Sequence, residues 1–248
     1  MTKKSDFDRY NDQVIQRTAN TERVSIDQGL RSYMLGIYNY MSLGLAMTGI
    51  VAYLASTSPE LMRTIYGNEE SHLLRWIVML APIGFVFFLS FRISQIKAST
   101  AQLLFWIYAA LMGLSLSFIF LLYTGMSISR VFFITAGTFA GMSLYGYTTK
   151  KDLTGWGSFL FMGLIGILIA SLVNLFLASS ALQFAISIIG VLIFTGLTAY
   201  DTQQIKQEYY YGGSSEDMKK KSIMGALRLY LDFINLFLML LRLFGDRR

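Results

Sequence analysis

The sequence predicts an all-α integral membrane protein with seven transmembrane helices. Hydrophobic residues make up 54% of its 248 residues and charged residues only 15%, against about 25% charged residues in soluble domains. The charges leave long stretches free, and several of these stretches match the roughly 20 apolar residues needed to cross a bilayer. The stretches are continuous and not alternating, which disfavours the strands of a membrane β-barrel.

The first four helices lie between successive charged residues, and we expect them at 33–55, 76–91, 101–123 and 131–148. The second of these is short, because only 16 uncharged residues, Trp76 to Phe91, separate Arg75 from Arg92. At 1.5 Å per residue it would span about 24 Å. We therefore expect that Arg92 lies within the membrane or that the bilayer is thinned there.

The last three helices follow from one long uncharged stretch and one charged one. The 48 residues from Leu153 to Tyr200 contain no charge, which is too long for one crossing. The small and polar residues 178–181 divide this stretch, which predicts helices at 156–177 and 182–204. The final helix, 223–243, differs from the others because it contains Arg228, Asp232 and Arg242.

The N-terminal residues 1–31 are polar and of mixed charge, without the short apolar core of a signal peptide. We interpret them as a cytoplasmic arm that is ordered or partly disordered. Residues 32–245 then form a single transmembrane domain. With the N-terminus inside, 14 of the 21 Lys and Arg residues lie in inside segments and six in outside segments, as expected for this orientation. The basic C-terminal end is discordant, and it would return inside if the last segment were re-entrant.

The net charge of +6 raises the question of a nucleic-acid partner. The basic residues are dispersed among loops and form no face with base-stacking aromatic residues, so we expect none. The chain has no cysteine and one histidine, which excludes disulfide scaffolds, thiolate or histidine-cluster metal sites and cysteine nucleophiles. We expect a protein that is not an enzyme, with no tightly bound cofactor and the lipid bilayer as its constant partner.

Ionisable residues inside a membrane are candidates for function, because burying charge there is costly. Three such residues fall in the inner third of the membrane by separate counts along their helices: Asp201, Asp232 and Arg92. Two carboxyls that share a low-dielectric site titrate in coupled steps. Such a pair suits pH sensing or transient binding of a cation such as Ca²⁺ through carboxylate oxygens.

Each of these residues also has a purely structural interpretation. Asp201 could be an interfacial residue at a helix end, and Arg92 could extend its charge to the membrane boundary. Asp232 could pair with Arg228, which lies four residues earlier on the same helix face. The residues alone leave these alternatives open.

Three segments resemble the Bax inhibitor-1 family of transmembrane proteins. Two contain the aspartates: Thr198-Ala-Tyr-Asp201-Thr-Gln203 and Leu229-Tyr-Leu-Asp232-Phe-Ile-Asn-Leu-Phe-Leu. The third, Asp27-Gln-Gly-Leu-Arg-Ser-Tyr-Met-Leu-Gly-Ile-Tyr-Asn-Tyr-Met, is similar to bacterial members. Hydropathy and segment order agree over roughly residues 25–245, so the resemblance also places the chain in a bacterial inner membrane.

The resemblance implies a seven-helix fold whose last helix is central and wrapped by the other six. It also implies a pH-sensitive calcium leak gated by two aspartates, matched here by Asp201 and Asp232. A family arginine that can bridge to this pair is best matched by Arg92. Some relatives have a further carboxylate in the third helix, but this sequence has none between Lys97 and Arg130.

Two other functions compete with a calcium leak. The polar arm and the loop Tyr209-Tyr-Tyr-Gly-Gly could bind a partner, which would make the protein a regulator of a membrane quality-control protease or of a stress response. Aspartates on consecutive helices also occur in intramembrane aspartyl proteases. The Gly-x-Gly-Asp pattern of those enzymes is missing, because Leu229-Tyr-Leu precedes Asp232. The sequence does not define an oligomeric state.

Overall fold

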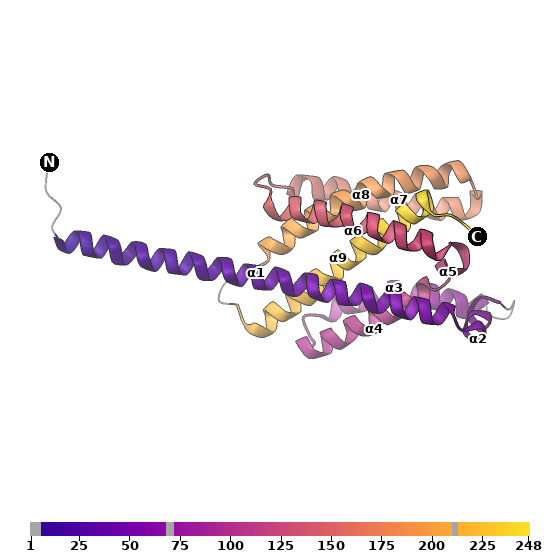
Figure 1. Ribbon diagram of the computed structural model, residues 1–248, viewed down its shortest axis with the longest axis horizontal. Coiled ribbons are helices and arrows are strands. Elements are labelled where there is room, and N and C mark those ends of the chain that lie inside the picture. Colours follow the sequence, from indigo (N-terminus) through magenta and orange to yellow (C-terminus); the bar gives the residue numbers. More distant parts are fainter. Residues whose placement is uncertain (1–5, 68–71, 210–212) are drawn as a thin grey trace.

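The computed structural model describes residues 6–67, 72–209 and 213–248 of the chain. These residues form helices joined by short connections, and seven of the helical segments described are long and apolar enough to cross a membrane. The expectation of an all-α integral membrane fold with seven spans is therefore confirmed. The helices form one elongated bundle, from which the first helix projects (Figure 1).

The seven spans lie close to the expected positions. Between α1 and α3, the short helix α2 (Pro59–Met62) and the π-helical turn η1 (Arg63–Gly67) form a connection. The third span is built from α4 and the single turn α5. In chain order, the spans are α1 (Asp6–Ser56), α3 (His72–Arg92), α4 (Ala98–Leu116) with α5 (Ile119–Leu122), α6 (Gly125–Thr148), α7 (Thr154–Leu177), α8 (Ser180–Gln207) and α9 (Ser215–Phe244).

The N-terminal arm is not separated from the first span. Helix α1 runs without interruption from Asp6 to Ser56, and its residues 27–56 form a segment long and apolar enough to span a membrane. The indigo part of α1 extends well beyond the other helices (Figure 1). From residue 6 on, the arm is therefore helical and continuous with the first span.

The expected shortness of the second span is wrong. Helix α3 has 21 residues and begins at His72, so Arg75 lies within it. The Arg75 guanidinium donates a hydrogen bond of 2.9 Å to the carbonyl of Tyr66. Counting from charge to charge began the helix too late, because Arg75 lies in its first turn and bonds to the preceding turn. The full helix is about 30 Å long, which matches the hydrocarbon core without thinning.

The division of the long uncharged stretch is confirmed. Helix α7 ends at Ala178, which adopts a left-handed conformation with φ of 48° and whose N–H donates to the carbonyl of Asn174. Ser179 then accepts a hydrogen bond from the N–H of Leu182 and so caps α8. A left-handed residue ends a helix, and a serine is a preferred N-cap. These two residues reverse the chain direction.

Helix α9 is the most buried span. In its most apolar window, 72% of residues are buried, compared with 11–39% in the other spans. It packs against α1, α4, α6 and α8, whereas α3 packs mainly on α4 and α7 mainly on α8. The span that contains charged residues therefore lies inside the protein, where other helices shield it from lipid.

Buried hydroxyl groups connect the helices around α9. Thr48 of α1 donates to the carbonyl of Ala109 on α4 at 2.8 Å, and it also bonds to the hydroxyl of Tyr230 on α9 at 2.6 Å. On the opposite side, the hydroxyls of Ser143 on α6 and Thr202 on α8 are 2.9 Å apart. Polar bonds between helices are a main source of specificity in membrane proteins, where the hydrophobic effect does not hold helices together. They fix α8 and α9 in one register relative to their neighbours.

Candidate functional site

The candidate site lies where α8 packs against α9. Asp201 is on α8, about two turns before the helix ends, and Asp232 is in the middle of α9. Both side chains line the same cavity between these helices. Asp232 is only 5% exposed, and Asp201 is partly buried. Residues that are 31 positions apart in the sequence thus form one pair in the protein interior.

The chemistry of this pair depends on protons. Oδ2 of Asp232 is buried and has no hydrogen-bond donor among the described residues. Two ionised carboxylates offer only acceptors, so the two groups can bond to each other only when one of them is protonated. When both are ionised, they repel each other across a site that water reaches poorly. The contact between α8 and α9 at this point therefore changes from attractive to repulsive with a single proton.

A cavity of about 480 Å³ adjoins the aspartate pair. Its walls come from α7, α8 and α9, and they are mostly apolar, with Phe161 and Leu164 on the α7 side. Polar groups gather at the pair itself, where Arg228 and Asn235 also line the cavity. The cavity is large enough for several water molecules or a partly hydrated ion.

Arg228 is the arginine beside this pair. It lies one turn before Asp232 on α9, and its charge acts on both carboxyls. Its guanidinium forms an ion pair of 2.6 Å with Glu208, the residue that follows α8. Arg228 is therefore bound to a third carboxylate, and in this structure no ion pair forms between it and Asp232 among the described residues.

Arg228 also separates two cavities. On the side away from the pair, it lines a second cavity of about 590 Å³ between the end of α3 and the start of α9. This second cavity is more charged, and its walls include Glu208, Asp217, Lys220 and Lys221. The Arg228–Glu208 ion pair thus lies between the second, more charged cavity and the cavity beside the aspartate pair.

Arg92 does not meet the aspartates. It is the last residue of α3, its side chain is exposed, and it donates a hydrogen bond of 2.6 Å to Oε1 of Gln95. Its depth along the helix was a reasonable basis for expecting a contact. The Arg92 side chain nevertheless points away from the aspartates, because α3 packs on α4 at the edge of the bundle and Arg92 lies on the outward face of α3.

Sequence reasoning did not single out Glu208. The signal was present, since Glu208 follows Asp201 by two helical turns and Arg228 precedes Asp232 by one. Residues separated by whole turns share a helix face. Glu208 therefore lies on the same face of the chain as Asp201 and Arg228 on the same face as Asp232, which allows the two to form an ion pair beside the aspartates. The loop 209–213, which was considered as a partner surface, lies mostly outside the described residues.

A resident metal is not supported by the ligands present. Among the residues that the structure describes, no group of three or more His, Cys, Asp or Glu side chains comes together. Calcium takes six to eight oxygen ligands in stable protein sites, and the pair offers only its own carboxylates with Asn235 nearby. The described residues thus offer few oxygen ligands at this point, and water would complete the coordination shell of any cation bound there.

Comparison with known proteins gives a family match over most of the chain. A family model described as "Inhibitor of apoptosis-promoting Bax1" matches residues 30–248. The inner membrane protein YbhL of Escherichia coli is 49% identical over 222 residues, which cover 89% of this chain and 94% of that protein.

Other bacterial relatives are similar over almost the same length. The uncharacterized protein RP147 of Rickettsia prowazekii is 50% identical over 231 residues, covering 93% of this chain and 96% of the relative. An uncharacterized membrane protein of Streptococcus pyogenes is 36% identical over 220 residues, covering 88% and 94%. A family match over nearly the whole chain and relatives this similar show that the protein belongs to the Bax inhibitor-1 family.

Proposed function

We propose that the protein is a pH-sensitive calcium leak of the bacterial inner membrane, with a cytoplasmic N-terminus and with Asp201 and Asp232 as its gate. One observation carries this proposal. Two carboxyls from neighbouring spans line one cavity of about 480 Å³. Burying two acids together in this way is costly, and pH sensing with cation passage is a function that uses them.

The proposed gate works through the contact between α8 and α9. A shared proton joins the two carboxyls, whereas loss of that proton leaves two negative charges that repel. A passing Ca²⁺ ion would relieve this repulsion, because its charge compensates both carboxylates. Proton binding and calcium passage then compete for the same oxygens, which makes the leak depend on pH.

The test is calcium flux into proteoliposomes that contain the full chain, measured between pH 5 and pH 8. In the double variant D201N/D232N, we expect the pH dependence of the flux to disappear. The matched control is D152N, since the Asp152 carboxylate is exposed in the α6–α7 connection and accepts a hydrogen bond from the N–H of Thr154, which an asparagine can also do. Unchanged flux and unchanged pH dependence in the double variant would rule out this gate.

Arg228 provides a second test of the same site. It lines both cavities and binds Glu208, so R228Q should shift the pH midpoint of flux. R92Q removes the same charge from an exposed position at a helix end and should leave the midpoint in place. The reverse result would return the bridging role to Arg92.

The helical extension of α1 favours a second candidate function. Residues 6–26 continue the first span away from the bundle (Figure 1), which offers a partner a helix outside the membrane. In this alternative, the protein regulates a membrane quality-control protease or a stress response. Deletion of residues 2–26 would then abolish cross-linking to a specific membrane protein and leave calcium flux intact. If the protein is a calcium leak without such a partner, no specific cross-link is expected with or without these residues, and the deletion should leave calcium flux unchanged.

A further inference from the structure

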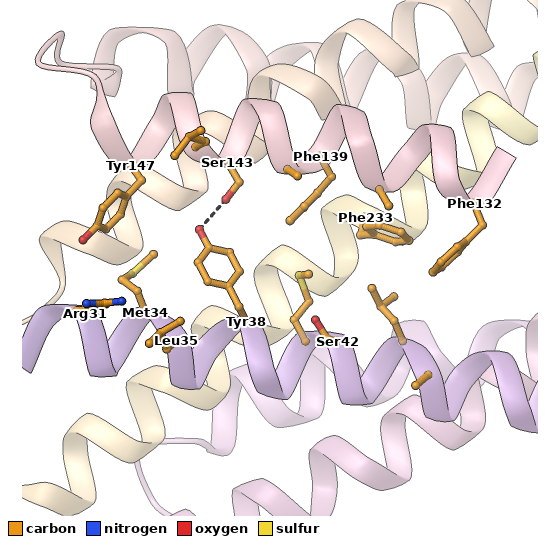
Figure 2. A pocket seen from close by; sticks show the side chains of 16 residues that line it. Arg31, Met34, Leu35, Tyr38, Ser42, Phe132, Phe139, Ser143, Tyr147 and Phe233 are labelled. Carbon is orange, nitrogen blue, oxygen red and sulfur yellow. Dashed lines mark hydrogen bonds between the residues drawn. The ribbon is translucent and has the colours of Figure 1, made fainter. Parts of the chain in front are cut away.

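A groove of about 780 Å³ lies between α1 and α6, and neither aspartate lines it. Phe233 of α9 contributes to its floor. Figure 2 shows the side chains of the two walls facing each other, with one hydrogen bond of 2.6 Å crossing between them, from Tyr38 on α1 to Ser143 on α6. The proposed calcium gate makes no use of this groove.

The groove opens sideways toward the bilayer. Its walls belong to the spans Asp27–Ser56 and Gly125–Thr148. The rim side chains Leu35 and Leu144 are 52% and 63% exposed, so no other helix in the described part of the chain covers them. At this depth the surroundings are hydrocarbon, and an apolar groove open to hydrocarbon is accessible to a lipid acyl chain.

The two ends of the groove differ in polarity (Figure 2). Arg31 and Tyr147 lie at one end, whereas Phe132 and Phe233 lie toward the other. Among the described residues that line the groove, Arg31 is the one with a charge. The groove is thus charged at one end and apolar along the rest, as a phospholipid is charged at its headgroup and apolar along its acyl chain.

The polar end favours an anion. The Lys206 ammonium group lies 4.9 Å above the ring of Tyr147 and donates to the Tyr147 carbonyl at 2.8 Å. Lys150 and Lys151 follow one turn later in the chain. The acids close to these cations in the chain are Asp27, Asp152 and Glu208, of which Glu208 forms its ion pair with Arg228, so the four basic residues outnumber the acids at this end. Arginine binds phosphate through a planar fork of donors, and tyrosine is favoured at the membrane interface.

The length of the groove also fits one lipid tail. Along α1 it runs from Arg31 to Ala46, which corresponds to about 22 Å at 1.5 Å per residue. Half of the hydrocarbon core is about 15 Å thick. The groove therefore extends from the interface at Arg31 through one leaflet to the bilayer centre.

We propose that this groove binds one acyl chain of an anionic phospholipid from the leaflet on the Arg31 side, with the phosphate group held at Arg31. The tail lies between α1 and α6 and passes over Phe139 and Phe233. Tyr38 and Ser143 lie beneath it and keep the walls together. The site does not depend on the calcium function, and its occupancy can be measured without any flux assay.

The experiment uses the full chain in phosphatidylcholine vesicles that contain a small fraction of photoreactive phosphatidylglycerol. The photoreactive group is a diazirine near the end of the acyl chain, and the adducts are mapped by mass spectrometry. We expect adducts on residues 41–46 of α1 and 132–140 of α6. Their yield should exceed that of a phosphatidylcholine probe with the same chain by about fivefold, the effect of one basic residue at an anionic membrane surface.

Two pairs of variants separate the headgroup from the tail. R31Q should remove the preference for phosphatidylglycerol, whereas K219Q, an exposed lysine outside the groove on α9, should retain it. A140W fills the groove and should remove adducts from both probes. I134W adds similar bulk to a 45% exposed position of α6 that does not line the groove, and it should leave the adducts in place.

Three results would overturn the proposal. One is equal labelling of the groove and of the lipid-facing residues Leu168 and Leu172 on α7. This result would mean that the groove is only in contact with the surrounding bilayer and does not bind a lipid. Another is a preference for phosphatidylglycerol that survives R31Q, since R31Q changes an exposed residue and is not expected to unfold the protein. The last is cross-linking of the groove to a second copy of the chain in place of lipid.

Discussion

Helices α7 and α9 show opposite relations between hydropathy and burial. In its most apolar stretch of 18 residues, α7 has a mean hydropathy of 2.5, compared with 1.7 for the same length of α9. Yet only 11% of this stretch is buried in α7, compared with 72% in α9. In a soluble protein the more apolar helix would lie inside. In a bilayer the apolar helix can face lipid, and the helix with ionisable residues needs protein around it. Charge in the middle of a span, more than apolarity, therefore marks the interior of this fold, whereas the two arginines of the lipid-facing helix α3 lie near its ends.

The largest effect is expected from placing charge on the exposed helix. Leu168 of α7 is 61% exposed and faces lipid. An aspartate in mid-span costs about 3 kcal/mol of membrane insertion, so L168D should strongly reduce insertion in a glycosylation-mapping assay. A181D, at an exposed position in the first turn of α8, should insert normally. Normal insertion of L168D would contradict the view that α7 faces lipid.

Removing volume from the buried helix should have the next largest effect. Leu236 of α9 is fully buried, so L236A leaves a cavity and should lower the free energy of unfolding by about 2 kcal/mol. L168A removes the same atoms from a lipid-facing position and should change it by less than about 0.5 kcal/mol. Unfolding by detergent titration measures both values. Equal losses would show that the two helices are not packed differently.

A smaller effect is expected for one buried hydrogen bond. Y230F removes the hydroxyl that bonds to Thr48 at 2.6 Å, while the ring keeps its contacts with Phe105 and Tyr108. Bonds between membrane helices contribute about 0.6 kcal/mol on average, and the same detergent titration should show a loss of this size. Y145F, at a 44% exposed position of α6, should show none. A neutral Y230F would mean that this bond between α1 and α9 adds nothing to the stability of the fold.

The smallest effect concerns a connection outside the membrane. Hydrogen bonds from Thr154 hold the pKa of the Asp152 carboxyl below its ordinary value. A lowered pKa in the folded state means that the carboxylate stabilises the fold above its ordinary pKa, and that this contribution is lost as the pH falls through the lowered value. D152A should therefore be slightly less stable than the natural sequence at pH 7 and equally stable in acid. A difference that grows in acid would contradict this assignment.

Much of the fold was predictable from the positions of charged residues. Six uncharged stretches and one charged stretch correspond to the seven spans, and residues 178–181 were correctly predicted as the turn between α7 and α8. Span boundaries were less predictable where charges bond locally. Arg75 pairs with a carbonyl and so lies inside α3, and α9 begins at Ser215, two turns before the expected residue 223.

The site was only partly predictable, for a geometric reason. Counting along a helix gives the depth of a residue but not the direction in which its side chain points. Depth placed Arg92 level with the aspartates, whereas packing turns it outward and brings Arg228 and Glu208 to them. The groove between α1 and α6 could not be predicted at all, because it depends on how far apart two helices lie that are separated by about 100 residues in the chain.

The central claim is that Asp201 and Asp232 act as one proton-controlled unit. The most direct measurement is the pH midpoint and amplitude of calcium flux in D201N, in D232N and in the double variant, compared as a double-mutant cycle. We expect each single variant to abolish the pH dependence as completely as the double variant does. The reason is that a proton is shared between two carboxyls only when both are present, and each single variant leaves one carboxyl beside an amide. Independent and additive effects of the two variants would contradict it.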